Sequence, residues 1–383
     1  MIGLVLCGGL GLVLLVYGGW QWRNWRNWRR VGAAPPTIEA TTPPPPRLAL
    51  LIPYRNEAAN LARLLGDLGQ LDYPNLEVVL IDDHSEDAGP RLVAEAVAKN
   101  DGRLRSLALA DHLNGRSVVA HKKEALAYAI SLTGADLILT TDADCRLPPT
   151  LPQHIVAAFG QGNDVVLGPV LTEPPFPSLL PAFQGLDFAA YQLYTVACVA
   201  AGRPTLANGA CFAFRRELFE AVGGYRGVEH LPSGDDVLLL HKFVHHPGVR
   251  FGWHAGPPVL TRAVPTWRGL WQQRLRWAGK AGYYASPELQ RGQALAFLTA
   301  LGLLVTLAYG LLTLSLAVLL FAGAAWLIKA VIDYLLLRDV AHHYGQGELL
   351  RWYPLVQLAH PAYLVAVGTG ALLGVKVGWK GRE

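Results

Sequence analysis

The chain has 383 residues and a formal net charge of +4, and its charged residues are unevenly distributed. Residues 47–290 carry most of the charge, whereas 1–20 and 293–375 are strongly apolar. This segregation argues against an ordinary soluble protein, which spreads its apolar residues through periodic elements, and indicates a soluble body between membrane anchors. Part of the basic excess forms one cluster beside the first apolar segment, which fits a membrane surface better than a nucleic-acid groove.

The cysteines argue against a disulfide framework and against a structural zinc site. All of them are scattered, without a CxxC or a Cys/His pairing at metal-ligand spacing: Cys7, Cys145, Cys198 and Cys211. Reduced thiols in a cytosolic compartment fit this pattern.

The N-terminal segment, residues 1–20, is predicted to be a transmembrane helix. Its uncharged run is long enough to cross a bilayer. Four arginines follow it directly, at positions 23, 26, 29 and 30, and the positive-inside rule places that side in the cytoplasm. Residues 21–46 are predicted to be a basic, tryptophan-containing juxtamembrane segment followed by a proline-rich linker.

Residues 47–266 are predicted to form a cytoplasmic catalytic domain, because short apolar runs alternate there with helical ones. The expected strands are 47–55, 76–83, 135–144 and 163–170, and the expected helices are 57–71, 88–99 and 117–131. This order predicts an α/β fold with a mostly parallel, Rossmann-like sheet and helices on both faces. Without a G-x-G-x-x-G at the first helix or a P-loop motif, a dehydrogenase and a P-loop nucleotidase are disfavoured.

Polar residues cluster at the carboxyl ends of three predicted strands, where ligands bind in such sheets. They are Arg55, Asn56 and Glu57 after the first strand, Asp82, Asp83, His84 and Ser85 after the second, and Asp142 and Asp144 after the third. The last two are separated by one residue, so both can face the same side and share one divalent cation.

Two further charged pairs each allow two interpretations. Asp235 and Asp236 precede an apolar helix, where they either cap its first turn or supply a general base, best assigned to Asp236 with Asp235 as the alternative. Lys122 and Lys123 lie on a helix, where they either form a solvated face or compensate the charge of a diphosphate.

Residues 267–290 are predicted to be an amphipathic helix on the membrane surface. Within it, Gln273, Arg276 and Trp277 either line an acceptor pocket, with Trp277 stacking on a sugar ring and Arg276 near phosphate, or serve interfacial anchoring only.

Residues 293–375 are predicted to hold two or three membrane helices. The segment 293–337 suffices for two crossings joined by a turn at 310–315, and a third apolar stretch covers 352–375. A complete third crossing would put the basic tail, Lys376–Arg382, outside, so a re-entrant segment is the alternative. Lys329 and Asp333 are four residues apart and either pair or reach an interface separately.

Seven motifs in chain order resemble those of family 2 glycosyltransferases with the GT-A fold. They are IPYRNE (52–57), IDDHSED (81–87), HKKEAL (121–126), TDAD (141–144), NGACFAFRRELFEAVGGY (208–225), GDD (234–236) and QRLRW (273–277). The last is a QxxRW motif, which is typical of the membrane-bound branch that includes ceramide glucosyltransferases and processive polysaccharide synthases. The chain departs from the family pattern at Asp235, where many members have Glu, and at His121, where Gly is common.

The resemblance implies a metal-dependent, inverting transfer of a sugar from a nucleotide-sugar, most commonly a UDP-sugar. The predicted interfacial helix and the few C-terminal crossings favour a hydroxyl of a membrane lipid as the acceptor, because a lipid can reach the site laterally. The site would face the cytoplasm at a bacterial inner (plasma) membrane, without a nucleic-acid partner and with protein partners unspecified. A processive polysaccharide synthase that extends a glycan acceptor is the alternative.

The same resemblance assigns roles to individual residues. The nucleotide-sugar would be held by Pro53, Tyr54, Arg55, Glu57, Asp82, Asp83, Lys122, Asp142, Asn208 and Gly209. Mg²⁺ or Mn²⁺ would be held by Asp142 and Asp144, and the base would be Asp236 or Asp235. The acceptor and diphosphate would contact Ala210, Gln273, Arg276 and Trp277.

Overall fold

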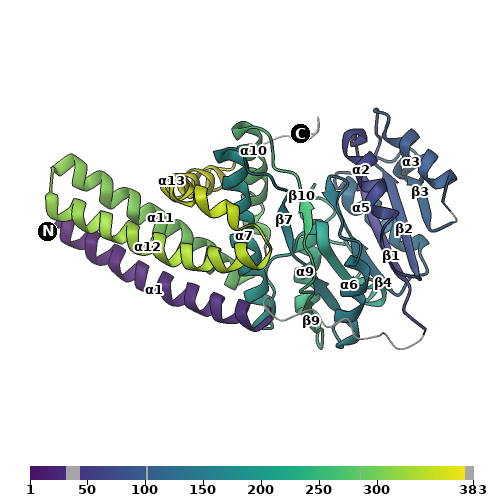
Figure 1. Cartoon of the computed structure of the whole chain (residues 1–383), viewed down its shortest axis with the longest axis horizontal. Helices are drawn as coiled ribbons and strands as arrows, with labels where there is room; N and C mark the ends of the chain where they lie inside the picture. The colour runs from purple at the N-terminus through teal and green to yellow at the C-terminus, as the bar shows by residue number, and fades with distance from the viewer. Residues whose placement is uncertain (32–43, 101, 285, 376–383) are drawn as a thin grey trace. The chain divides into compact units, whose positions relative to one another are not determined.

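The computed structural model describes residues 1–31, 44–100, 102–284 and 286–375, and the chain divides into two compact units (Figure 1). The sheet unit comprises Arg30–Glu173 and Cys198–Arg262, and the helical unit comprises Met1–Arg29, Pro174–Ala197 and Ala263–Glu383. Residues 32–43 of the predicted linker and the basic tail Lys376–Arg382 lie outside the described residues.

The sheet unit is built on a seven-stranded sheet with the order β3-β2-β1-β4-β8-β6-β9. Its strands are β1 (Leu48–Tyr54), β2 (Leu76–Asp82), β3 (Leu104–Ala108), β4 (Leu137–Thr140), β6 (Val165–Leu167), β8 (Phe212–Arg215) and β9 (Phe251–Trp253). Every neighbouring pair is parallel except the two that β8 makes with β4 and β6. The predicted α/β fold with a mostly parallel sheet is therefore confirmed.

Helices lie between the strands in the chain order of the sheet unit. They are α2 (Ala58–Leu68), α3 (Gly89–Ala98), α4 (Leu109–Leu113), α5 (His121–Leu132), α6 (Leu151–Gly160), α8 (Arg216–Ala221) and α9 (Asp235–His245). Figure 1 labels α2, α3, α5, α6 and α9 among them. In α2 the buried side chains include Leu61, Leu64 and Leu68, which recur at helical spacing and form its core-facing stripe. Leu48–Ile52 of β1 are completely buried, as expected for a strand covered on both faces.

The segment 163–170, predicted as one strand, is divided between two sheets. Gly168 and Pro169 end β6, and β7 (Val170–Thr172) joins β5 (Cys145–Arg146) and β10 (Val259–Thr261) in a three-stranded sheet. Proline cannot donate a hydrogen bond to a strand ladder, so a break at this position is expected. A Cβ on Gly168 would collide with His254 and Cys211, which explains why a residue without a side chain is needed there.

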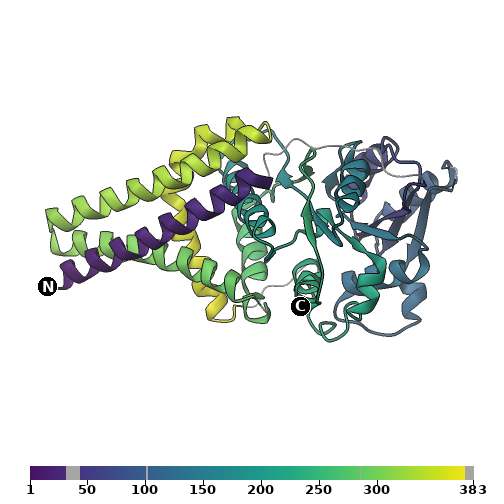
Figure 2. The same cartoon turned by 90° about the horizontal axis from the view of Figure 1, so that it is seen from below.

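The helical unit contains most of α1 (Ile2–Val31) and of α7 (Leu179–Ala200), together with α10 (Trp267–Ala278), α11 (Pro287–Thr313), α12 (Leu316–His343) and α13 (Tyr353–Leu372). Figure 1 shows α1, α11 and α12 side by side, and Figure 2 shows α13 running across their direction. Within the described part of the chain, four helices are long and apolar enough to cross a membrane: Ile2–Val31, Pro287–Thr313, Leu316–His343 and Gly347–Leu372. They identify the chain as a membrane protein.

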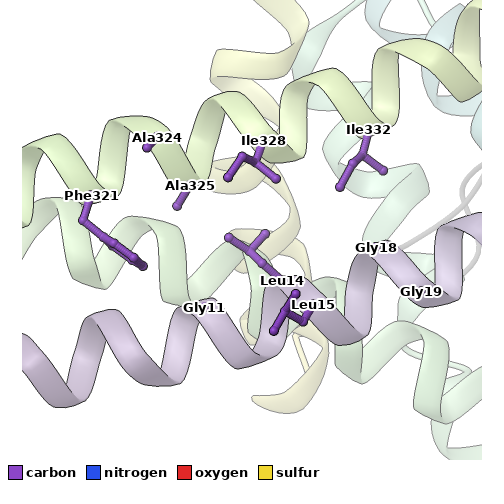
Figure 3. A pocket seen from close by; sticks show the side chains of 10 residues that line it. All are labelled: Gly11, Leu14, Leu15, Gly18, Gly19, Phe321, Ala324, Ala325, Ile328 and Ile332. Carbon is purple, nitrogen blue, oxygen red and sulfur yellow. The ribbon is translucent and has the colours of Figure 1, made fainter.

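An apolar cavity of about 400 Å³ lies between α1 and α12 (Figure 3). Its lining residues are Gly11, Leu14, Leu15, Gly18, Gly19, Phe321, Ala324, Ala325, Ile328 and Ile332. The glycines present no side chain toward α12, so α1 leaves open space there that larger residues would fill. Because every lining residue is apolar, this contact between the helices relies on packing rather than on hydrogen bonds.

A buried polar network joins α1 to α12 beyond that cavity. The Lys329 Nζ lies 2.5 Å from the Asp333 Oδ2, and the Tyr17 hydroxyl donates to the Asp333 Oδ1 over 2.6 Å. The Lys329 side chain is only 2% exposed, so it pairs within the protein and does not reach an interface. The predicted pairing of Lys329 with Asp333 is confirmed.

Substituting Lys329→Met is expected to lower the free energy of unfolding by about 3–5 kcal/mol, because Asp333 would remain as a buried charge without its cationic partner. The measurement is SDS-driven unfolding in mixed micelles. Arg338→Met is the matched control on the same helix: the Arg338 side chain is 47% exposed, and Asp339 keeps Arg29 as a second cationic partner, so a loss of at most about 1 kcal/mol is expected. Equal losses in the two variants would contradict this assignment.

Candidate active site

The loops that hold the predicted site residues meet at one edge of the main sheet. Tyr54 at the end of β1 pairs with Asp82 at the end of β2, and Thr140 at the end of β4 pairs with Phe212 at the start of β8. Since β8 is antiparallel, the segment before it reaches the same edge as the carboxyl ends of its neighbours. The Thr140 hydroxyl donates to the carbonyl of Gly209 over 2.8 Å and fixes that segment.

Lys122 connects two acidic segments at this edge. Its Nζ lies 2.7 Å from the Asp142 Oδ1 and 3.0 Å from the Asp235 Oδ2. Burial alone would lower the pKa of Lys122, but Asp142, Asp235 and Asp236 together raise it well above its usual range, so the ammonium stays charged. Lys122 therefore belongs to the acidic cluster and not to a solvated helix face.

Asp235 and Asp236 open α9, directly after Gly234, whose φ of 81° lies in the left-handed region that favours glycine. The amide of Gly209 donates to the Asp236 Oδ2 over 2.9 Å. Asp235 is buried beside Lys122, whereas Asp236 is partly exposed. A carboxylate in the first turn is stabilised by the helix dipole, so helix capping and a chemical role are compatible here.

Asp142 and Asp144 lie in the loop directly after β4, as predicted. Their carboxylate oxygens are ligands that Mg²⁺ and Mn²⁺ accept. Asp142 already binds one cationic group, the ammonium of Lys122, which shows that the loop favours positive charge. Burial, followed by Asp144 and Asp142, raises the pKa of the Cys145 thiol well above its usual range, so Cys145 adds no anionic sulfur ligand. The donor set fits a hard divalent cation.

Hydrogen bonds hold the loops after β1 and β2 together. The amide of Asn56 donates to the Ser85 hydroxyl over 3.0 Å, and the amide of Glu86 donates to the Asn56 Oδ1 over 2.8 Å. The amide of Ala58 donates to the Asp87 Oδ2 over 2.8 Å. The predicted nucleotide-binding positions of these two loops, Pro53, Tyr54, Arg55, Glu57, Asp82 and Asp83, thus lie on adjacent parallel strands or directly after them.

The remaining predicted site residues, Gln273, Arg276 and Trp277, lie on α10 of the helical unit. Thr266 caps the start of this helix, where its hydroxyl accepts from the amide of Gly269. The Trp277 ring packs 4.3 Å from the Arg274 guanidinium, and the Arg274 Nη2 lies 2.7 Å from the Asp187 Oδ2. No sequence motif predicted this buried ion pair between two helices.

Residues 10–383 match glycosyl transferase family 21. The chain belongs to this family. The predicted resemblance to membrane-bound family 2 enzymes is thereby confirmed in its main point, a membrane glycosyltransferase.

Two relatives of this family 21 glycosyltransferase carry the name beta-monoglucosyldiacylglycerol synthase. That of Synechocystis sp. is 26% identical over 258 residues, which cover 65% of this chain and 51% of the relative. That of Trichormus variabilis is 28% identical over 248 residues, which cover 62% of this chain and 49% of the relative. The chain spans about half the length of these curated relatives.

Among solved structures, the mannosyltransferase PcManGT from Pyrobaculum calidifontis, in complex with GDP-Man and Mn²⁺, has a TM-score of 0.60. It is 22% identical and covers 98% of this chain and 99% of its own. This likeness supports the same fold for the glycosyltransferase.

Lys123, for which the sequence allowed two interpretations, is buried and bonded to a loop of the sheet unit. Its side chain is 2% exposed, and its Nζ donates to the carbonyls of Val228 and Leu231 over 2.8 and 2.7 Å. These bonds fix the loop that leads to Gly234 and α9. The adjacent lysines of α5 therefore both contact the start of α9 or the loop before it: Lys122 contacts Asp235, and Lys123 contacts the loop that precedes α9.

Proposed function

We propose that this family 21 glycosyltransferase transfers a sugar from a UDP-sugar to a hydroxyl of a membrane lipid. The observation that carries the proposal is the cluster of Lys122, Asp142, Asp235 and Asp236 at the ligand-binding edge of the sheet, in a chain with membrane-spanning helices. Relatives named as beta-monoglucosyldiacylglycerol synthases support a lipid as the acceptor.

Asp236 is the proposed general base. It is the partly exposed member of the acidic pair, and the Gly209 amide holds it in place, whereas Asp235 is buried and paired with Lys122. The acceptor hydroxyl gives its proton to the Asp236 carboxylate, and its oxygen forms a bond to the anomeric carbon. The bond from that carbon to the diphosphate breaks, and its electron pair leaves with the nucleoside diphosphate. Attack opposite the leaving group inverts the anomeric configuration.

Asp142 and Asp144 would hold Mg²⁺ or Mn²⁺. When bound, the cation neutralises negative charge on the leaving diphosphate. Lys122 keeps its own positive charge beside Asp142 and orients this carboxylate through the 2.7 Å contact. The loops after β1 and β2 would hold the nucleotide, through Pro53, Tyr54, Arg55, Glu57, Asp82 and Asp83, while Asn208, Gly209 and Ala210 would lie by the donor sugar or acceptor.

We place the sheet unit on the cytoplasmic side of a bacterial inner membrane, because the arginines at 23–30 follow the first membrane helix. The proposal assigns Gln273, Arg276 and Trp277 to the acceptor. Trp267 and Trp271 of the same helix are exposed, as expected for a helix at a membrane interface.

Substituting Gly209→Ala is expected to reduce kcat about 10-fold or more, because misplacing reacting groups by about 1 Å can cost 100-fold in rate. An added Cβ would lie 3.1 Å from the Lys122 Nζ and 3.2 Å from the Asp235 Oδ2, and would push this ion pair apart. Steady-state transfer kinetics measure the effect. Gly160→Ala is the control, since a Cβ there meets nothing within 4 Å. An unchanged kcat in Gly209→Ala would show that the ion pair of Lys122 and Asp235 does not contribute to the rate of sugar transfer.

The proposal is tested with the full chain in lipid nanodiscs, supplied with radiolabelled UDP- and GDP-sugars, Mg²⁺ or Mn²⁺, and a total bacterial lipid extract. Products are separated by organic extraction and by size. Label in the organic phase that requires Asp236 is expected, and the labelled lipid identifies the acceptor. Label in a large aqueous polymer would overturn the lipid assignment and identify a processive polysaccharide synthase.

A further inference from the structure

Two histidines beside the nucleotide-binding loops have no role in the proposed reaction. The Nδ1 atoms of His84 and His121 lie 3.0 and 2.9 Å from the same oxygen, the Oδ1 of Asp83. Asp83 and His84 follow β2, and His121 is the first residue of α5. The two imidazole rings meet edge to face, with centroids 5.6 Å apart. Segments 37 residues apart in the chain thus bring three metal-ligating side chains together.

The spacing of these atoms suits one small cation. One ligand atom from each of the three side chains lies within 4.8 Å of the others. A tetrahedral cation with bonds of about 2.0–2.1 Å holds its ligands about 3.3 Å apart. The two oxygen-to-nitrogen distances need to open by only a few tenths of an ångström to reach that value.

The backbone at His84 is adapted to this arrangement. His84 has a φ of 58°, in the left-handed region that non-glycine residues enter at a cost. Such conformations persist where the surrounding structure requires them, and they gather at ligand sites. Here the turn directs the His84 ring back toward Asp83, beside the His121 ring.

We infer that Asp83, His84 and His121 form a second metal site, which binds a borderline-soft divalent cation of the Zn²⁺ class. Imidazole nitrogen suits Zn²⁺ and its neighbours in the transition series, whereas the carboxylates of Asp142 and Asp144 suit Mg²⁺ and Mn²⁺. Three protein ligands leave a fourth position for water, as in open zinc sites. To bind, each histidine keeps its ring proton on Nε2, and Nδ1 becomes the ligand atom.

Occupancy of this site is expected to inhibit the enzyme. Asp83 belongs to the proposed nucleotide-binding set, so a cation on its carboxylate removes it from the nucleotide. This consequence rests on the proposed function, whereas metal binding does not. Zinc-class ions would then regulate donor binding at a place separate from the catalytic cation.

The binding test uses the full chain in nanodiscs, purified with a tag that lacks histidine, and titrated with Co²⁺ in excess Mg²⁺. Visible absorption bands of tetrahedral Co²⁺ are expected in the wild type, with displacement by Zn²⁺. Removing a ligand should cost more than the 10–100-fold typical of second-shell changes, so His84→Gln and His121→Gln should each weaken binding by about 100-fold or more. His112→Gln is the matched control: His112 also lies 3.0 Å from a carboxylate, that of Glu124, but the described residues form no three-ligand cluster there.

The assignment would be overturned if the wild type showed no Co²⁺ bands. It would also be overturned if the bands persisted in His84→Gln and His121→Gln, or if they disappeared in His112→Gln. The second measurement is Zn²⁺ inhibition of sugar transfer in excess Mg²⁺, expected to be relieved by His121→Gln. If the chain transferred no sugar at all, the Co²⁺ spectra would still decide the metal site. Failure of the two proposals can therefore be distinguished.

Discussion

Substituting Asp236→Asn is expected to reduce sugar transfer by about 10²–10⁴-fold, the usual contribution of a positioned general base. Asparagine keeps the size of the side chain and can still accept the hydrogen bond from the Gly209 amide, but it cannot take up the acceptor proton. The fold and the donor site should therefore survive. Single-turnover transfer measures the chemical step, and calorimetric titration with UDP should give a Kd close to that of the wild type.

Asp235→Asn is the comparison that decides between the two acids. Because Asp235 lies 3.0 Å from the Lys122 Nζ, its loss should weaken donor binding by releasing the lysine. If Asp235→Asn slowed the chemical step more than Asp236→Asn does, and bound UDP as the wild type does, Asp235 would be the base. Near-normal turnover in both variants would place the base outside this pair.

Substituting Asp144→Asn is expected to weaken Mn²⁺-dependent binding of UDP by about 10–100-fold or more, because the change removes a proposed ligand and second-shell changes alone cost that much. Titrations with UDP at several Mn²⁺ concentrations measure the shift. Binding in the absence of metal should change little, since the loops after β1 and β2 remain intact.

Asp136→Asn is the matched control for this substitution. Asp136 directly precedes β4, at the opposite end of the strand from Asp142, and its Oδ2 accepts from the amide of Arg47. It should retain metal-dependent binding. If Asp144→Asn and Asp136→Asn behaved alike, the cation would not be held at the loop after β4.

The edge of the sheet that carries the site could be predicted because three of the predicted strands end in polar residues after an apolar run. Parallel pairing of neighbouring strands is then enough to predict that Tyr54 lies beside Asp82. The direction of β8 could not be predicted in this way, since its four residues show no pattern that distinguishes parallel from antiparallel pairing. The contact of Lys122 with Asp235 depends on that direction and joins segments 113 residues apart.

In the helical unit, sequence reasoning was limited to neighbours on one helix. The spacing of Lys329 and Asp333 allowed their pairing, because residues four apart lie on the same face. Tyr17, the other partner of Asp333, is 316 residues away, and hydrophobic periodicity carries no information about such a contact. The same limit applies to Arg274 and Asp187, which lie on different helices.

The direction of α13 has a consequence for the topology of the chain. Because α13 runs across α1, α11 and α12, we expect it to lie in the interface, so that the polypeptide traverses the bilayer an odd number of times (Figure 2). With its amino end outside, the C-terminus would then share the compartment of the catalytic unit, and the basic residues at 376–382 would obey the same charge rule as the arginines at 23–30. A C-terminal alkaline phosphatase fusion should be inactive in bacterial cells, and a C-terminal fluorescent protein should be bright.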